Sequence, residues 1–238
     1  SERIHLFDTP LLVSRNMGLA VDQRAAKRVM DILISGIGII ITSPIMLIIA
    51  TAVKAYDRGP VFYFQDRLTL GGKPFKICKF RSMCVDSEKN GARLASKHDS
   101  RITPVGHVLR NLHLDELPQL FNVFKGDMSL VGPRPERESI MLEYEKELPE
   151  FYYRLKVKAG LTGYAQVYGK YNTTPYDKLK LDLFYIENYS FLLDIKLIFM
   201  TVKIFFQKEV SEGVDDRQVN ALKDSGKNAG VSENKTEE

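Results

Sequence analysis

Two adjacent carboxylates stand out as groups that could do chemistry. Asp115 and Glu116 lie between Leu114 and Leu117, so leucines flank a charged pair. Burying neighbouring carboxylates is costly unless cations or hydrogen-bond donors compensate. If Asp115 caps a helix that begins there, the helix dipole keeps its carboxylate ionised, a suitable state for a nucleophile or a Mg²⁺ ligand. The ordinary interpretation is a helix N-cap followed by a first-turn glutamate.

Basic residues elsewhere in the sequence favour a site over this ordinary interpretation. The candidates for phosphate binding are Lys79, Arg81, Arg110 and Arg134. Lys79 and Arg81 share one side of an expected strand by parity, and prolines on both sides restrict the backbone of Arg134. Each cation alone would be a surface charge. Gathered around a carboxylate pair, they indicate a site for phosphates and a divalent metal, with Asp115 as the metal ligand.

Composition excludes some classes of protein and permits others. The chain has 238 residues, is 44% hydrophobic and carries a net charge of +4, which permits but does not require a phosphate-bearing or membrane partner. Cys78 and Cys84 are too few for a disulfide framework. There is no P-loop, dinucleotide fingerprint or catalytic triad, and no nucleic-acid partner is expected.

The elements that must position these residues begin with an apolar segment at residues 32–53. It carries no charged residue and as a helix would extend roughly 33 Å, about the hydrocarbon thickness of a bilayer. Pro44 cannot donate to the carbonyl of Ile40, so a kink or break is expected there, with the hydroxyls of Thr42 and Ser43 satisfying the freed groups.

The sequence leaves two arrangements of this segment open. Basic residues flank both of its ends, which favours a helix that enters the bilayer, bends at Pro44 and leaves on the same face, because a single span collects Lys and Arg on one side. A kinked transmembrane span is equally compatible with the residues. A buried helix of a soluble protein is the least favoured, because it would need apolar cover all round.

The remaining patterns predict a mostly helical α+β fold with a short β-hairpin. The expected hairpin strands are 61–64 and 75–80, the expected helices are 104–112, 115–126, 136–148 and 177–189, and residues 160–163 are expected to turn. The apolar pattern of residues 191–206 predicts a helix. It is either an interfacial amphipathic helix with Lys196 and Lys203 at its edge or an ordinary core helix. Residues 208–238 are expected to form a disordered tail.

The motifs of residues 27–194 resemble those of the bacterial sugar transferases, the monotopic polyprenol-phosphate phosphoglycosyl transferases. The stretches that carry the resemblance are Lys27-Arg28 with Asp31, Ser43-Pro44, Gly59-Pro60-Val61-Phe62, Lys79-Phe80-Arg81-Ser82-Met83, Leu114-Asp115-Glu116-Leu117-Pro118, Gly126-Asp127-Met128-Ser129-Leu130-Val131-Gly132-Pro133-Arg134-Pro135 and Gly160-Leu161-Thr162-Gly163. One departure is Thr69, where the family usually has glycine, so the hairpin could be shaped differently.

The resemblance implies a fold and an organisation. It implies a lead-in segment at 1–20, a re-entrant membrane helix at 21–56 broken at Ser43 and Pro44, a cytosolic catalytic domain at 57–207 and the tail at 208–238. The opening residues resemble the stretch before the catalytic module of larger members, so the chain is expected to be such a module. The expected location is the bacterial inner membrane, with the active site facing the cytoplasm.

The resemblance also implies a reaction. Asp115 would attack the sugar-linked phosphate of a UDP-sugar and release UMP, and a polyprenyl (undecaprenyl) phosphate would then take the sugar phosphate, as the first membrane step of exopolysaccharide, capsule or O-antigen synthesis. Glu116 would handle a proton or place Asp115, and Mg²⁺ would neutralise the diphosphate. An idle scaffold and a phosphohydrolase are the competing hypotheses. The sugar, the polyprenol length and whether the chain is a homo-oligomer are not specified.

Overall fold

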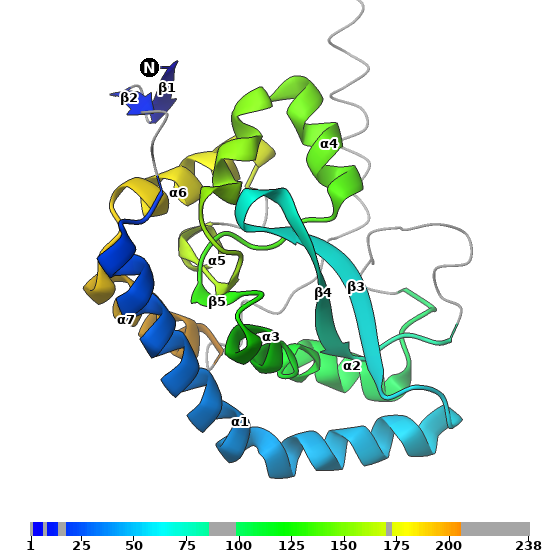
Figure 1. Ribbon diagram of the computed structural model, residues 1–238. Helices are drawn as coiled ribbons and strands as arrows, with labels where there is room; N and C mark the ends of the chain where they lie inside the picture. Colours follow the sequence, from blue (N-terminus) through cyan, green and yellow to red (C-terminus); the bar gives the residue numbers. More distant parts are fainter. Residues whose placement is uncertain (1, 7–8, 14–17, 86–98, 170–172, 206–238) are drawn as a thin grey trace, which may run out of the picture.

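The computed structural model describes residues 2–6, 9–13, 18–85, 99–169 and 173–205 of the chain. Within these residues the fold is mostly helical, with strands that pair only two at a time. One long bent helix, α1 (Val21–Asp57), runs down one side and beneath the other elements (Figure 1). The expected mostly helical α+β fold is confirmed. The predicted disordered tail lies outside the described residues.

Helix α1 is long and apolar enough to cross a membrane, by length and composition. Its large apolar side chains point outward over much of its length; Ile40, Ile41, Leu47 and Ile48 are each about 70% exposed. An apolar surface of this extent marks a contact with lipid or with another protein. The helix therefore indicates membrane association.

The bend in α1 follows from Pro44, which lies inside the helix. Proline removes one helical hydrogen bond and crowds the preceding turn. The Ser43 hydroxyl donates to the freed carbonyl of Ile40 at 2.8 Å, and Thr42 donates to Gly38 at 2.7 Å. Figure 1 shows α1 bent near its middle yet continuous. The expected kink is confirmed, and so is the compensation by Ser43. Thr42 bonds instead to the carbonyl of Gly38, which Pro44 does not free, and the helix is not broken.

A buried polar network fixes the first half of α1. Lys27 forms an ion pair with Asp194 of α7 (Phe191–Phe205) at 2.5 Å, and Tyr185 of α6 (Pro175–Glu187) donates to the other Asp194 oxygen at 2.7 Å. One turn further along α1, the Asp31 carboxylate accepts hydrogen bonds from Ser129 and from the Leu130 amide. These contacts join α1 to α6, to α7 and to the segment of Ser129 and Leu130 through buried groups.

The expected hairpin forms and is longer than the sequence indicated. Strands β3 (Phe62–Thr69) and β4 (Lys73–Phe80) pair antiparallel, and Gly71 and Gly72 take positive φ in the turn between them. Thr69 is extended, with φ at −128°, so its position needs no glycine. Its hydroxyl donates to the Asp127 carbonyl at 2.9 Å and accepts from the Ala159 amide, which ties the hairpin to two loops.

Two expectations about local structure were wrong. Residues 160–163 do not simply turn, because β6 (Gly160–Thr162) pairs in parallel with β5 (Ser129–Val131). No regular helix begins at residue 115: a 3-10 turn, η2 (Leu114–Glu116), comes first, and α3 (Gln119–Lys125) begins only after Pro118. Asp115 is therefore not the N-cap of α3.

Of the remaining helices, α2 (Pro104–Asn111), α4 (Glu138–Glu147), α6 and α7 lie close to the predicted ranges, whereas the 3-10 helix η3 (Pro149–Lys156) and the short helix α5 (Tyr164–Tyr168) were not predicted. Helix α2 is capped by Thr103, whose hydroxyl accepts the Gly106 amide at 2.9 Å. Strands β1 (Glu2–Leu6) and β2 (Thr9–Val13) form a hairpin near the N-terminus. Helix α7 buries Leu197 and exposes Leu192, Phe199 and both lysines, Lys196 and Lys203.

Candidate active site

The carboxylate pair sits on a short turn whose leucines anchor it. His113 adopts a left-handed conformation after α2, and η2 follows at once. Leu114 and Leu117 pack on a buried cluster that contains Val53 and Phe80. Because the leucines face this cluster, the carboxylates between them are only half-buried. The leucine spacing thus places the acidic pair at the edge of the core.

Glu116 is held by two cations. Its Oε1 accepts from Lys79 Nζ at 2.6 Å and from Arg134 Nη2 at 2.9 Å. Burial alone would raise the pKa of Glu116, but the charges and hydrogen bonds of Arg134 and Lys79 outweigh it, so the pKa lies below its usual range. An ionised glutamate with two cationic partners is a poor proton donor, but it can hold both cations in position.

Asp115 has a different environment. In the described part of the chain its carboxylate takes part in no hydrogen bond or ion pair. Burial raises its pKa; Lys79 opposes this effect, and the negative charge of Glu116 adds to it. The helix dipole that was expected to keep the carboxylate ionised is absent, and the nearby cations offset the effect of burial only in part. An unpartnered carboxylate beside Lys79 is suited to attack an electrophile or to bind a metal.

The neighbouring prolines on both sides of Arg134 restrict its backbone. Pro133 and Pro135 are buried, while the Arg134 side chain remains 45% exposed. Its carbonyl accepts from Arg154, which is itself buried in an ion pair with Asp182 at 2.8 Å. The Arg134 guanidinium is thus fixed at its base and open to solvent at its tip, where a phosphate can reach it.

The structure separates the other two cations that the sequence singled out. Arg110 lies on α2 close enough to Asp115 for its charge to lower that pKa. Arg81 lies just beyond the end of β4, and its guanidinium is engaged elsewhere: it donates to Asp57 at 2.6 Å and to the Pro60 carbonyl at 2.7 Å. Arg81 therefore holds the end of α1 against the hairpin, and phosphate binding by Arg81 is not favoured.

One positioning residue escaped the sequence analysis. The Asn122 amide of α3 donates to the Lys76 carbonyl at 2.8 Å and accepts from the Cys78 amide at 2.9 Å. These bonds fasten α3 to β4, which brings Lys79 beside Glu116. Asn122 lies one turn into α3, and no spacing rule distinguishes it from a surface asparagine.

An apolar cavity of about 340 Å³ opens beside Glu116 and Arg134. It is lined chiefly by leucine, isoleucine and valine side chains from α3, β5, β6, α5 and α7, among them Leu120, Leu130, Leu161, Val167, Ile198 and Val202, and by Leu117 just after η2. Gln166 also lines it, and its buried amide nitrogen and oxygen have no hydrogen-bond partner among the described residues. An apolar cavity with a charged end and an unsatisfied amide suits an amphiphilic ligand.

The residues around Asp115 can be tested against the expected Mg²⁺. No group of three or more His, Cys, Asp or Glu side chains gathers in the described ranges, so a site built wholly from protein is absent there. Mg²⁺ is commonly held by one or two carboxylates together with substrate phosphates. The free Asp115 carboxylate fits that pattern, whereas Glu116 is engaged by cations.

Comparison with known proteins places the chain in a family. Residues 22–208 match the family model of the bacterial sugar transferases, which covers most of the chain. The chain therefore belongs to the bacterial sugar transferase family.

Several named relatives share substantial identity with the chain. The UDP-N-acetylgalactosamine-undecaprenyl-phosphate N-acetylgalactosaminephosphotransferase of Aeromonas hydrophila is 46% identical over 180 residues, covering 74% of this chain and 43% of that protein. The UDP-glucose:undecaprenyl-phosphate glucose-1-phosphate transferase of Klebsiella pneumoniae is 44% identical, covering 84% and 42%. An enzyme of the same description from Caulobacter vibrioides is 38% identical, covering 82% and 75%. The chain thus spans about two fifths of the length of the first two relatives.

Proposed function

We propose that this protein transfers a sugar 1-phosphate from a UDP-sugar to a polyprenyl phosphate, through a covalent intermediate on Asp115. An Asp115 carboxylate oxygen forms a bond to the sugar-linked phosphorus, and UMP leaves with the electron pair of the broken phosphoanhydride. An oxygen of the lipid phosphate then attacks the same phosphorus and displaces the carboxylate. Two displacements replace one transfer between a soluble donor and a lipid acceptor.

The observation that carries the proposal is the placement of an unpartnered carboxylate, a cationic cluster and an apolar cavity at one site. Lys79 and Arg134 supply charge for phosphate oxygens, and the cavity beside Glu116 supplies an apolar wall for the first isoprene units of the acceptor. A phosphohydrolase would need no such wall. Bound at Asp115 and the diphosphate, Mg²⁺ would neutralise charge on the donor.

The role of Glu116 in this proposal is to hold cations. Its lowered pKa argues against proton transfer, and its contacts orient both Lys79 and Arg134. Arg110 adds positive charge near Asp115 from the other side.

Acceptor dependence of UMP release tests the reaction. We expect purified protein with Mg²⁺ to release UMP over many turnovers only when undecaprenyl phosphate is present, and to favour one sugar from a panel of UDP-glucose, UDP-galactose and their N-acetylated amino analogues. Full-rate UMP release over many turnovers without the lipid would instead identify a phosphohydrolase.

The pH dependence of the rate tests the electrostatics of Asp115. Because the attacking carboxylate must be ionised, the rate should fall as the pH drops through its raised pKa. The Lys79 charge lowers that pKa, so Lys79→Met should move the acidic limb of kcat/KM to higher pH as well as reduce the rate. Lys146→Met on the exposed face of α4 is the control. An unmoved acidic limb in Lys79→Met would assign the limb to another group.

We further propose that α1 enters one leaflet and returns to the cytoplasmic face of the inner membrane. The bend near the middle of α1 (Figure 1), the proline inside this helix and the exposed apolar residues on both of its halves support this topology. Exposed apolar residues and lysines on α7 support an interfacial position for that helix.

Removing the proline tests the topology. We expect Pro44→Ala to straighten α1 toward a full span, so that labelling sites placed before and after the helix become accessible from opposite sides of the membrane. Pro60→Ala, outside the helix, is the control and should leave both sites on one side. Unchanged accessibility in Pro44→Ala would show that Pro44 does not determine the topology.

A further inference from the structure

A second cavity lies apart from the acidic pair, at the beginning of α1. Its volume is about 280 Å³, and its walls come from α1, the turn between β3 and β4, β5, and the segment after η3. It is lined by Gly18, Leu19, Arg24, Lys27, Arg28, Asp31, Leu70, Ser129, Lys156, Val157 and Lys158, a set that shares no residue with the site around Asp115.

The charge lining this cavity is strongly unbalanced. Five of its lining residues are basic, and Asp31 is the one acidic residue among them. Asp31 is occupied by hydrogen bonds from Ser129 at 3.0 Å and from the Leu130 amide at 2.9 Å. Lys27 is neutralised by Asp194, at 2.5 Å. Contacts within the protein therefore engage the carboxylate of Asp31 and neutralise the charge of Lys27.

A third basic residue that lines the cavity, Arg28, stabilises the fold. Its guanidinium donates to the carbonyls of Val123 and Phe124 at 2.8 and 2.7 Å, at the end of α3. These carbonyls are the acceptors that a helix end leaves unsatisfied. They occupy hydrogen-bond donors of Arg28 but leave its positive charge facing the cavity.

Arg24 and Lys158 have no comparable partners. Within the described residues neither side chain forms a hydrogen bond or ion pair with another side chain. Lys158 is half-buried, and burial and the charge of Arg28 lower its pKa more than the carboxylates of Asp31 and Asp127 raise it. A half-buried ammonium beside a guanidinium gains from a bound anion that neutralises both charges.

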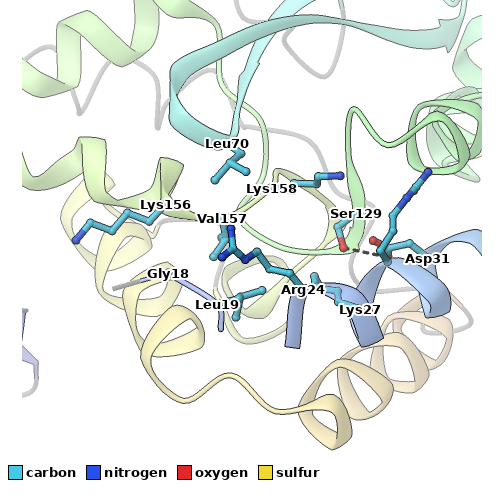
Figure 2. A pocket seen from close by; sticks show the side chains of 11 residues that line it. Gly18, Leu19, Arg24, Lys27, Asp31, Leu70, Ser129, Lys156, Val157 and Lys158 are labelled. Atoms are coloured by element: carbon cyan, nitrogen blue, oxygen red, sulfur yellow. Dashed lines mark hydrogen bonds between the residues drawn. The ribbon is translucent and has the colours of Figure 1, made fainter. Parts of the chain in front are cut away.

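Figure 2 shows how these side chains are disposed. The Arg24 side chain crosses the cavity toward Val157, and Lys158 extends above the Ser129–Asp31 contact, whereas Lys156 points away at the edge. Arg24 and Lys158 thus approach the cavity from two different segments, so both can contact one group bound between them.

We propose that this cavity binds a phosphate group, with Arg24 and Lys158 as its direct ligands and Arg28 as a flanking charge. Charge-assisted hydrogen bonds to phosphate oxygens satisfy both side chains. The group is carried either by an anionic lipid headgroup or by a soluble phosphate. The cavity adjoins the start of α1, just before its apolar residues 32–53, where a headgroup would lie.

Thermal unfolding of the full chain tests the proposal without reference to catalysis. The midpoint is followed by circular dichroism in neutral detergent, with inorganic phosphate against sodium chloride of equal ionic strength. It is followed in parallel in nanodiscs of phosphatidylcholine with and without phosphatidylglycerol. We expect one of the two probes to raise the wild-type midpoint by about 2–4 °C.

Matched variants separate this site from general electrostatics. Arg24→Gln with Lys158→Gln should bind the effective probe at least about tenfold more weakly, while Lys146→Gln on α4 should respond as wild type. Arg24→Lys with Lys158→Arg keeps both charges and should retain most of the response. Phosphatidylglycerol as the effective probe indicates a lipid headgroup, and inorganic phosphate indicates a soluble ligand. If neither probe acts, or if the glutamine variant responds as wild type, the proposal is wrong.

Discussion

Replacing Asp115 by asparagine is expected to reduce UMP release by roughly 10³-fold or more. The amide keeps the shape of the side chain but removes the negative charge that attacks phosphorus, so the covalent step is lost. Because the Asp115 carboxylate makes no hydrogen bond or ion pair within the described residues, the substitution should leave the fold unchanged. The measurement is the turnover rate with UDP-sugar and undecaprenyl phosphate, together with the unfolding midpoint and membrane binding.

Two comparisons make this result interpretable. Glu143→Gln, an exposed carboxylate on α4, should retain the full rate. Glu116→Gln should lose activity less completely than Asp115→Asn, because it weakens the hold on Lys79 and Arg134 without removing the nucleophile. Substantial turnover by Asp115→Asn would rule out Asp115 as the nucleophile.

Replacing Asp194 by alanine is expected to lower the free energy of unfolding by about 3–5 kcal/mol. Asp194 is fully buried and accepts from both Lys27 and Tyr185. Its loss leaves a buried ammonium without a partner and releases α7 from α1. The unfolding midpoint should fall by roughly 10 °C, measured by circular dichroism in the same detergent as wild type.

The double variant Lys27→Met with Asp194→Leu distinguishes an unpaired charge from lost packing. Replacing both members of a buried pair by apolar residues is often neutral, so much of the lost stability should return. If Asp194→Ala alone unfolds at the wild-type temperature, the network does not hold α1 to α7.

The bend of α1 and the hairpin could be predicted from sequence because each depends on local chemistry. Pro44 removes a specific hydrogen bond, and Ser43 lies beside the carbonyl that it frees. Gly71 and Gly72 supply the positive φ that the turn between β3 and β4 requires. Neither inference needs a contact between distant parts of the chain.

The start of α3 was mispredicted because two local rules compete. An aspartate before a helical pattern indicates an N-cap, but here the chain forms a 3-10 turn, and Pro118 then precedes the first residue of α3. Strand β6 escaped prediction because its three residues become a strand only by pairing with β5. Its pattern alone resembles a turn with two glycines.

The composition of the site was partly predictable. Asp115, Glu116, Lys79, Arg110 and Arg134 do lie together, whereas Arg81 pairs with Asp57. Parity along a strand placed Lys79 and Arg81 on one side, but β4 ends at Phe80, so the rule no longer applies at Arg81. The apolar cavity, with residues from six elements and Gln166 without a partner among the described residues, depends on tertiary packing that spacing does not encode.

Intact-mass analysis of the protein after brief exposure to UDP-sugar, Mg²⁺ and no lipid acceptor tests the central claim most directly. The covalent mechanism predicts a mass increase of one sugar phosphate, located on the peptide that contains Asp115, absent from Asp115→Asn and discharged when undecaprenyl phosphate is added. Lipid-dependent UMP release with no adduct under any quenching condition would contradict it and indicate direct transfer from donor to acceptor.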